Sequence, residues 1–150
     1  SIIVVHMGGG LTVNLVQNGR ITDVEDGRQN GPFSTEAAGG VPLPDFIEAY
    51  WGKATSSKEL IKFWYGKGGV MAHLGSNSVK HVVENAKNGD THADAILHAM
   101  CYQINKSAGA MYAAANGIVE AVVVTGGIAQ SDYIISQLKQ NMSWIKPVVV

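Results

Sequence analysis

The beginning of the chain carries the hydrophobic pattern of β-strands. Residues 2–6 form a continuous apolar run that ends in His6, and its β-branched residues predict a strand buried on both faces. Residues 11–15 alternate between apolar and polar side chains, as a half-buried strand does. Asn18-Gly19 predicts a two-residue hairpin turn, because both turn positions need positive φ. A third strand over residues 20–25 completes a predicted antiparallel meander.

A loop over residues 26–42, rich in glycine, proline and asparagine, follows this meander. It is longer than most connections in compact domains, and such loops are often functional. Short helices are predicted next. One begins at Pro44, whose fixed φ suits the first helical turn, and two others cover residues 57–65 and 78–86.

Residues 91–116 carry the clearest helical pattern. Apolar side chains recur at spacings of three and four from Ala93 to Ala115, which predicts a helix with one face on the core. Thr91 and Asp94 match the signature of a capping box at its start. Gly117 stands where a helix-ending glycine is expected.

The remainder reads as a strand that ends near Thr125, a glycine turn, a helix, and the start of a parallel strand at residues 148–150. Hairpin strands followed by parallel strands predict an α/β domain with a mixed sheet and helices packed on it. The ribonuclease-H-like fold of the actin-like ATPases has this arrangement. Both ends of the sequence look cut, so we expect residues 1–150 to be a single domain of a longer protein.

Composition narrows the classes of function. The chain has 150 residues, of which 46% are apolar and 15% charged, as in a globular domain. The net charge of -1 gives no reason to expect a nucleic-acid partner. No apolar run approaches the roughly 18 residues that indicate a membrane span. The single cysteine, Cys101, excludes an internal disulfide and favours a cytoplasmic protein.

Two glycine turns carry the candidate chemistry. At Gly8, Gly9 and Gly10, backbone amides without side chains can approach an anion, although a tight hairpin is the simpler alternative. His6 lies at the mouth of this turn, as a donor to a phosphoryl group or as a hydrogen-bonded core histidine. The second turn, residues 125–129, follows the carboxyl end of a strand, where α/β sheets bind ligands. It matches neither a Walker A loop nor a dinucleotide fingerprint.

The other chemically active side chains are interpreted as structural. Cys101 lies in the apolar stripe of the long helix and is expected to be an inert core thiol. Trp51, Trp64 and Tyr65 are expected in the core rather than in a stacking platform. Four histidines lack metal-like spacing and are interpreted as structural or solvent-exposed, so no metal site is assigned: His73, His81, His92 and His98.

Four ordered segments resemble the acetate and butyrate kinase family of the actin-like superfamily. They are HMGGGLTVNLVQNGRITDV (residues 6–24), GPFSTEAAGGVP (31–42), GKGGVMAHLGSNSVKHVV (66–83) and VVVTGGIAQS (122–131). The resemblance covers essentially the whole chain, and four blocks in order are more specific than any one of them. Branched-chain fatty acid kinases share these blocks.

The resemblance implies reversible phosphoryl transfer between ATP and the carboxylate of a short-chain fatty acid, with Mg²⁺ whose ligands lie largely outside this chain. His6 matches the histidine beside the transferring phosphoryl group, and Gly8, Gly9 and Gly10 match the phosphate turn. It also implies a homo-oligomer in the full-length protein, with the long helix available as an interface. The implied nucleotide contacts are Asn77, Ser78, Lys80, Gly126, Gly127 and Ile128.

The chain departs from the family pattern at two positions. Ser78 replaces the usual acidic residue, and Ala37 stands where the family has an arginine. Such an arginine stabilises charge on a transferring phosphoryl group. Either Arg28 or another residue of the loop substitutes, or the protein is impaired, or it works on a different substrate. The alternative function is a non-catalytic nucleotide-binding or structural module on the same fold.

Overall fold

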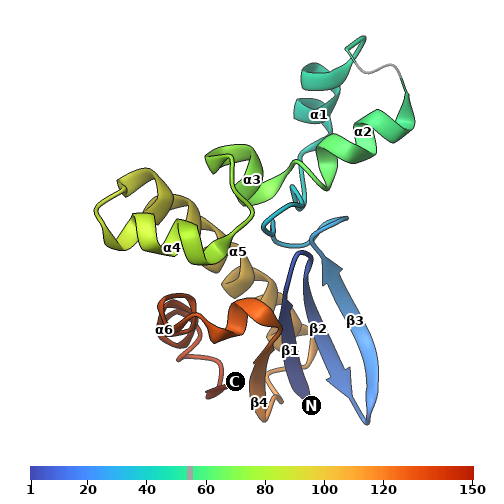
Figure 1. Ribbon diagram of the computed structural model, residues 1–150. Coiled ribbons are helices and arrows are strands. Elements are labelled where there is room, and N and C mark those ends of the chain that lie inside the picture. The colour runs from blue at the N-terminus through green and yellow to red at the C-terminus, as the bar shows by residue number, and fades with distance from the viewer. Residues whose placement is uncertain (54–55) are drawn as a thin grey trace.

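A mixed five-stranded sheet organises the computed structural model, which describes residues 1–53 and 56–150. The strand order is β3-β2-β1-β4-β5 (Figure 1). The first three strands form an antiparallel meander, and β4 and β5 extend the sheet in parallel with β1, so the predicted mixed sheet is confirmed. The bounds are β1 (Ile2–Met7), β2 (Leu11–Gln17), β3 (Arg20–Asp26), β4 (Ala121–Thr125) and β5 (Val148–Val149).

Helices occupy the connections between the strands. Over the described residues they are α1 (Leu43–Tyr50), α2 (Ser57–Trp64), α3 (Gly69–Leu74), α4 (Val79–Lys87), α5 (Thr91–Ala114), the short 3₁₀ helix η1 (Gly127–Gln130) and α6 (Asp132–Asn141). The sequence did not predict α3, because the helix begins at a glycine, which in a sequence indicates a break in a helix. In the structure this glycine, Gly69, has a φ of +57. None of the helices in the described part of the chain is both long and apolar enough to cross a bilayer.

The core lies between one face of the sheet and α5. Ile3, Val5 and Met7 of β1 are buried against it, whereas Val4 on the opposite face is half-buried and His6 is exposed. The prediction that the first strand is buried on both faces is therefore wrong for the described residues, because α5 packs on the face that carries Ile3, Val5 and Met7.

The predicted apolar stripe of α5 is confirmed. Leu97, Met100, Cys101 and Ile104 are all fully buried in the cluster that joins α5 to β1 and β2. Burial raises the pKa of the Cys101 thiol to about 12, which keeps it protonated and unreactive at neutral pH. The interpretation of Cys101 as an inert core thiol is consistent with this environment.

The start of α5 differs from the prediction. Asp90 is the N-cap, and its carboxylate accepts hydrogen bonds from the amides of His92 and Ala93, both at 3.0 Å. Thr91 is already the first helical residue, so the predicted capping box of Thr91 and Asp94 is wrong. An aspartate one position earlier satisfies the free amides first. Asp94 instead accepts a hydrogen bond from the hydroxyl of Tyr133 on α6.

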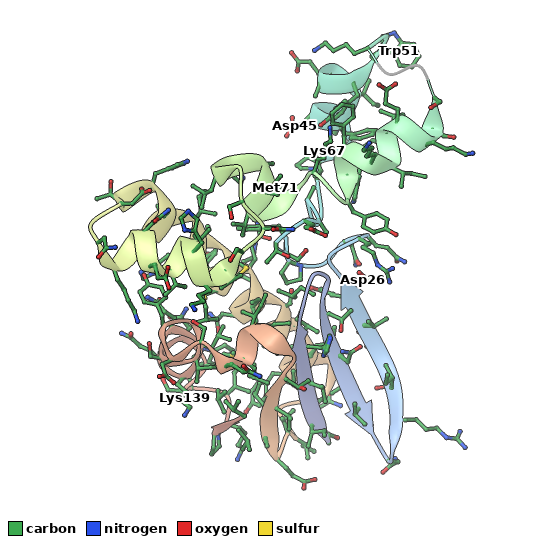
Figure 2. The ribbon with its side chains drawn as sticks, viewed as in Figure 1. Asp26, Asp45, Trp51, Lys67, Met71 and Lys139 are labelled. Atoms are coloured by element: carbon green, nitrogen blue, oxygen red, sulfur yellow. The ribbon has the colours of Figure 1, made fainter. Side chains whose placement is uncertain are left out.

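The helices α1 and α2 form a hairpin that projects beyond the end of the sheet (Figure 1). They pack on each other through aromatic rings, with Phe46 5.1 Å from Trp64 and Tyr50 5.7 Å from Phe63 between centroids. Trp51 is 83% exposed at the tip of this hairpin (Figure 2), and Tyr65 is 44% exposed. The prediction of a core position is therefore wrong for both residues, and the half-buried Trp64 also lies outside the core cluster, because neither helix of the hairpin contributes a buried side chain.

The cap of α5 gives a test of this description. We expect Asp90→Ala to lower the free energy of unfolding by about 1 kcal/mol, because the amides of His92 and Ala93 lose their acceptor. Thr91→Ala, the matched control, should change it by less than about 0.5 kcal/mol. Urea unfolding measures both. A larger loss of unfolding free energy for Thr91→Ala than for Asp90→Ala would contradict the assignment of Asp90 as the N-cap.

Candidate functional site

The two glycine turns leave the same end of the sheet, and the second turn packs on the strand that leads into the first. The strands β1 and β4 are parallel neighbours, with His6 opposite Thr125, so both turns follow carboxyl strand ends. Gly126 packs directly on the backbone of β1, where an added Cβ would lie 2.2 Å from the Met7 carbonyl oxygen. Its φ of +96 also favours glycine. The structure therefore joins two segments that lie far apart in the sequence.

A pocket of about 430 Å³ opens at the first turn, and it holds four of the predicted site residues. His6 is exposed to this pocket and lies beside the turn, since a Cβ built on Gly8 would be 3.7 Å from His6 Nε2. A core histidine is thereby excluded. The lining residues are His6, Gly8, Gly9, Gly10, Leu11, Thr12, Asp26, Arg28, Glu36, Ala37 and Tyr65.

The long loop fixes the shape of this turn. Ser34 Oγ and Thr35 Oγ1 donate hydrogen bonds of 2.9 and 3.2 Å to the carbonyl oxygen of Gly9. Both side chains are buried, and a bond of 2.8 Å from the Gly8 amide to the Gly10 carbonyl closes the turn. The exposed amides of Gly9 and Gly10 find no acceptor among the described residues. Such paired free amides form a concave binding site for an anion.

Arg28 brings positive charge to the same pocket. Its guanidinium lies 2.9 Å from Asp26 at the end of β3 and 5.6 Å from the centroid of the Tyr65 ring. The hydrogen bond from Arg28 lowers the pKa of the Asp26 carboxyl, so the pair stays ionised at neutral pH. The chain has one other arginine, Arg20, which starts β3 at the opposite end of the sheet.

Sequence reasoning did not select two further residues that line this pocket, Glu36 and Tyr65. Glu36 Oε1 accepts a hydrogen bond of 2.6 Å from Asn77 Nδ2, which ties the loop to the segment before α4. Tyr65 is drawn in because it forms an isolated β-bridge with Ala37. The sequence could have indicated Glu36, because it stands next to the position where the family has an arginine. No pattern in the sequence indicated the bridge between Tyr65 and Ala37.

A second pocket, of about 470 Å³, lies between α4, η1 and the start of α6. It contains three of the predicted nucleotide contacts, Lys80, Gly127 and Ile128. Burial, with a hydrogen bond to Asp94, raises the pKa of Tyr133 to about 12, so this wall presents a neutral phenol. The lining residues are Val79, Lys80, Val83, Glu84, Lys87, Gly127, Ile128, Gln130, Ser131, Asp132 and Tyr133.

The remaining predicted contacts, Asn77, Ser78 and Gly126, line neither pocket. Ser78 is the N-cap of α4, and its hydroxyl accepts a bond of 3.4 Å from the His81 amide. Asn77 holds Glu36, and Gly126 packs on Met7. In this structure they position the segments that line the pockets.

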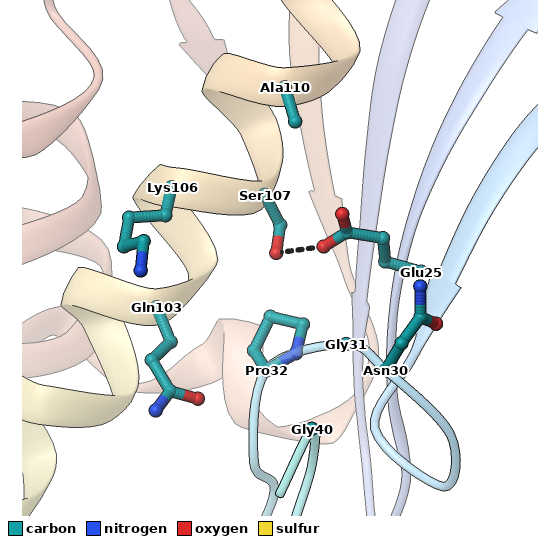
Figure 3. A pocket seen from close by; sticks show the side chains of 9 residues that line it. All are labelled: Glu25, Asn30, Gly31, Pro32, Gly40, Gln103, Lys106, Ser107 and Ala110. Atoms are coloured by element: carbon teal, nitrogen blue, oxygen red, sulfur yellow. Dashed lines mark hydrogen bonds between the residues drawn. The ribbon is translucent and has the colours of Figure 1, made fainter. Parts of the chain in front are cut away.

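A polar pocket of about 320 Å³ lies apart from both turns, between the end of β3, the long loop and α5 (Figure 3). Ser107 donates a hydrogen bond to Glu25 across it, and Gln103 Oε1 accepts a bond of 3.0 Å from the Phe33 amide. None of the predicted site residues lines it. These bonds fasten the loop to α5.

The other histidines are all exposed, in agreement with their interpretation: His73, His81, His92 and His98. His98 pairs with Asp94 at 3.6 Å and with Gln137 at 2.9 Å. Among residues 1–53 and 56–150, no group of three or more histidine, cysteine, aspartate or glutamate side chains is arranged to hold a metal ion.

Comparisons with known proteins identify the family of this chain. The sequence model of the Acetokinase family matches residues 1–143. The chain is 42% identical over 151 aligned residues to a "Probable butyrate kinase" of Clostridium botulinum (strain Eklund 17B / Type B), covering 100% of this chain and 42% of that protein. A "Probable butyrate kinase" of Phocaeicola vulgatus is 40% identical, with 100% and 43% covered. The chain thus spans about two-fifths of the length of these relatives.

Solved structures share the fold. Porphyromonas gingivalis acetate kinase superposes with a TM-score of 0.85 at 25% identity, over 96% of this chain and 37% of that one. A propionate kinase from Francisella tularensis gives 0.82 at 21% identity, over 95% and 38%. The predicted actin-like ATPase fold is confirmed by these likenesses.

The contact between the two turns predicts which glycine the fold requires. Gly126→Ala should lower the free energy of unfolding by about 2–4 kcal/mol, because the new Cβ meets the Met7 carbonyl at a backbone angle that alanine rarely adopts. Gly127→Ala is the matched control, since no atom lies within 4 Å of its added Cβ. Thermal unfolding of both variants is the measurement. Equal stability of the two would contradict the close packing at Gly126.

Proposed function

Because the chain belongs to the acetokinase family, we propose that it supplies the nucleotide and phosphate half of a short-chain carboxylate kinase. The full-length protein would transfer the γ-phosphoryl group of ATP to butyrate or a branched-chain analogue, giving an acyl phosphate and ADP reversibly. The observation that carries this proposal is the shared pocket of His6 and the three-glycine turn. The names of the relatives, butyrate kinases at 40–42% identity, support the substrate class.

The two pockets divide the nucleotide between them. The free amides of Gly9 and Gly10 would bind the phosphates, since such amides stabilise anions without a side chain in the way. The adenosine part would lie in the second pocket, against Gly127 and Ile128, with Lys80 near its rim. The contact of Gly126 with Met7 keeps the two pockets at one edge of the sheet.

His6 would act on the transferring group rather than on the acceptor. A carboxylate is ionised at neutral pH, so its oxygen attacks phosphorus without a general base. As the new oxygen–phosphorus bond forms, the bond to the leaving ADP oxygen breaks, and negative charge spreads over the phosphoryl oxygens. A donor placed beside the turn stabilises that charge more in the transition state than in the bound substrate.

Arg28 is our candidate for the role of the missing family arginine. It lines the same pocket as His6, and Asp26 fixes the direction of its guanidinium. The buried Ala37 also lines this pocket and offers no charge. A nucleotide-binding module without catalysis is the second candidate function, and the alanine at position 37 is the observation that favours it.

A magnesium ion, which such kinases use to neutralise the phosphates, is bound mainly by those phosphates and one or two carboxylates. Glu36 is the pocket carboxylate not engaged with an arginine, so it is the residue of this chain that fits the role. We assign no step to the ion.

We also propose that the full-length protein is cytoplasmic, since ATP is the phosphoryl donor. We propose further that it forms a homo-oligomer. The long helix α5 exposes small side chains that suit close packing against a second copy, namely Ala95, Ala99, Ala110 and Ala113.

A first test is His6→Ala in the full-length protein. We expect kcat to fall about 10²–10³-fold while nucleotide affinity changes less than about threefold, because the ring acts where charge develops. Acyl-phosphate formation and calorimetric titration with ATP measure the two quantities. An unchanged kcat would remove His6 from the reaction.

A second test separates Arg28 from the arginine outside the site. Arg28→Ala should reduce kcat by about 10³-fold or more if its charge stabilises the transferring group. Arg20→Ala, at the far end of the sheet, should leave kcat unchanged. If the unmodified protein binds nucleotide but shows no turnover, the result would instead support the non-catalytic module.

A further inference from the structure

An apolar pocket adjoins the His6 pocket on the side of the helical hairpin. It has a volume of about 310 Å³ and is lined by Arg28, Phe46, Leu60, Ile61, Trp64 and Tyr65. We propose that this pocket receives the hydrocarbon part of the carboxylate substrate, and that it selects chains bearing a branch or a phenyl group over acetate. The proposal rests on the proposed kinase function and names its substrate more closely.

Continuity between the two pockets is the first support. Arg28 and Tyr65 line both of them, so the residues that bound the phosphoryl-transfer pocket are also walls of the apolar one. A substrate whose carboxylate lies near His6 would therefore extend past Arg28 and Tyr65 toward α2. Because Arg28 is held by Asp26 and lies over the Tyr65 ring, this boundary has a defined position.

The chemistry of the lining is the second support. Beyond Arg28 and Tyr65, the wall is formed by the aliphatic and aromatic residues Phe46, Leu60, Ile61 and Trp64. Ile61 is 55% exposed and Tyr65 is 44% exposed on this wall. Covering such apolar surface with a hydrocarbon releases ordered water and favours binding.

The size of the pocket sets the class of chain. An apolar cavity of about 150 Å³ is large enough to bind benzene. At about 310 Å³ this pocket has room for a phenyl ring or a branched chain, whereas the methyl group of acetate would leave it filled with water. We therefore commit to carboxylates such as 3-methylbutanoate and 3-phenylpropanoate as the preferred occupants.

The test uses the full-length protein with two substitutions at one exposed position of α2. Ile61→Trp fills the pocket, and Ile61→Asp places a negative charge in it. Both should lower kcat/KM for 3-methylbutanoate and 3-phenylpropanoate at least about tenfold, while kcat/KM for acetate stays within about twofold. Calorimetry should show a matching loss of affinity for 3-phenylpropanoate.

The matched controls are Ile47→Trp and Ile47→Asp. Ile47 is an isoleucine of the same hairpin, 47% exposed on α1, and does not line the pocket. These variants should keep both the activity and the affinity of the unmodified protein. If they lose as much as the Ile61 variants, the hairpin acts only as a structural element and the proposal is overturned.

The outcomes also separate this proposal from the kinase function. Equal losses for acetate and the larger carboxylates in the Ile61 variants, or no loss for any of them, overturn the apolar pocket while the kinase stands. A protein that phosphorylates no carboxylate but binds 3-phenylpropanoate in an Ile61-dependent manner refutes the kinase and retains the pocket. Absence of such binding overturns the pocket.

Discussion

The contact of Gly126 with the backbone of Met7 is the constraint on which the site depends. Parallel pairing of β1 and β4 brings both carboxyl strand ends to one edge, but pairing alone leaves the following turns free to diverge. A side chain at position 126 would hold them apart, since its Cβ would lie 2.2 Å from the Met7 carbonyl oxygen. With glycine there, the second turn packs on the strand that leads into the first, as the proposed binding of one nucleotide across both turns requires.

The long loop is the second layer of this arrangement. Ser34 and Thr35 fix the carbonyl of Gly9, and Ser34 Oγ also accepts bonds from the amides of Glu36 and Ala37. One buried hydroxyl thus fixes both the turn at Gly8–Gly10 and the segment that carries Glu36. The same loop carries Arg28 near its start and leads into the helical hairpin, so one segment of the chain borders the His6 pocket and runs on to the apolar pocket.

Local patterns in the sequence predicted the elements whose cause is local. Alternation over residues 11–15, the Asn18-Gly19 turn and the stripe of α5 each depend on near neighbours, and each is observed.

The errors in the predictions arise where contacts between distant parts of the sequence decide the structure. Tyr65 reads as a core aromatic until its bridge with Ala37 turns it toward the site. Trp51 is apolar in the sequence, yet its hairpin packs on itself and leaves the ring in solvent. The functional roles of the glycines and His6 stay predictions.

Our proposal for Arg28 depends on how its guanidinium is held in the pocket. Asp26 binds the Arg28 guanidinium through its Nε and Nη2 groups, at 3.3 and 2.9 Å. A guanidinium has five N–H donors in a rigid plane, and here Asp26 and Tyr65 are its neighbours, so its orientation in the pocket is defined. Asp26 also removes rotational freedom that an unpaired arginine would lose on binding. The cost is competition, since Asp26 weakens the positive field that a phosphate in the ground state experiences. In the proposed reaction that field would matter most as charge accumulates during transfer, when the guanidinium is already oriented.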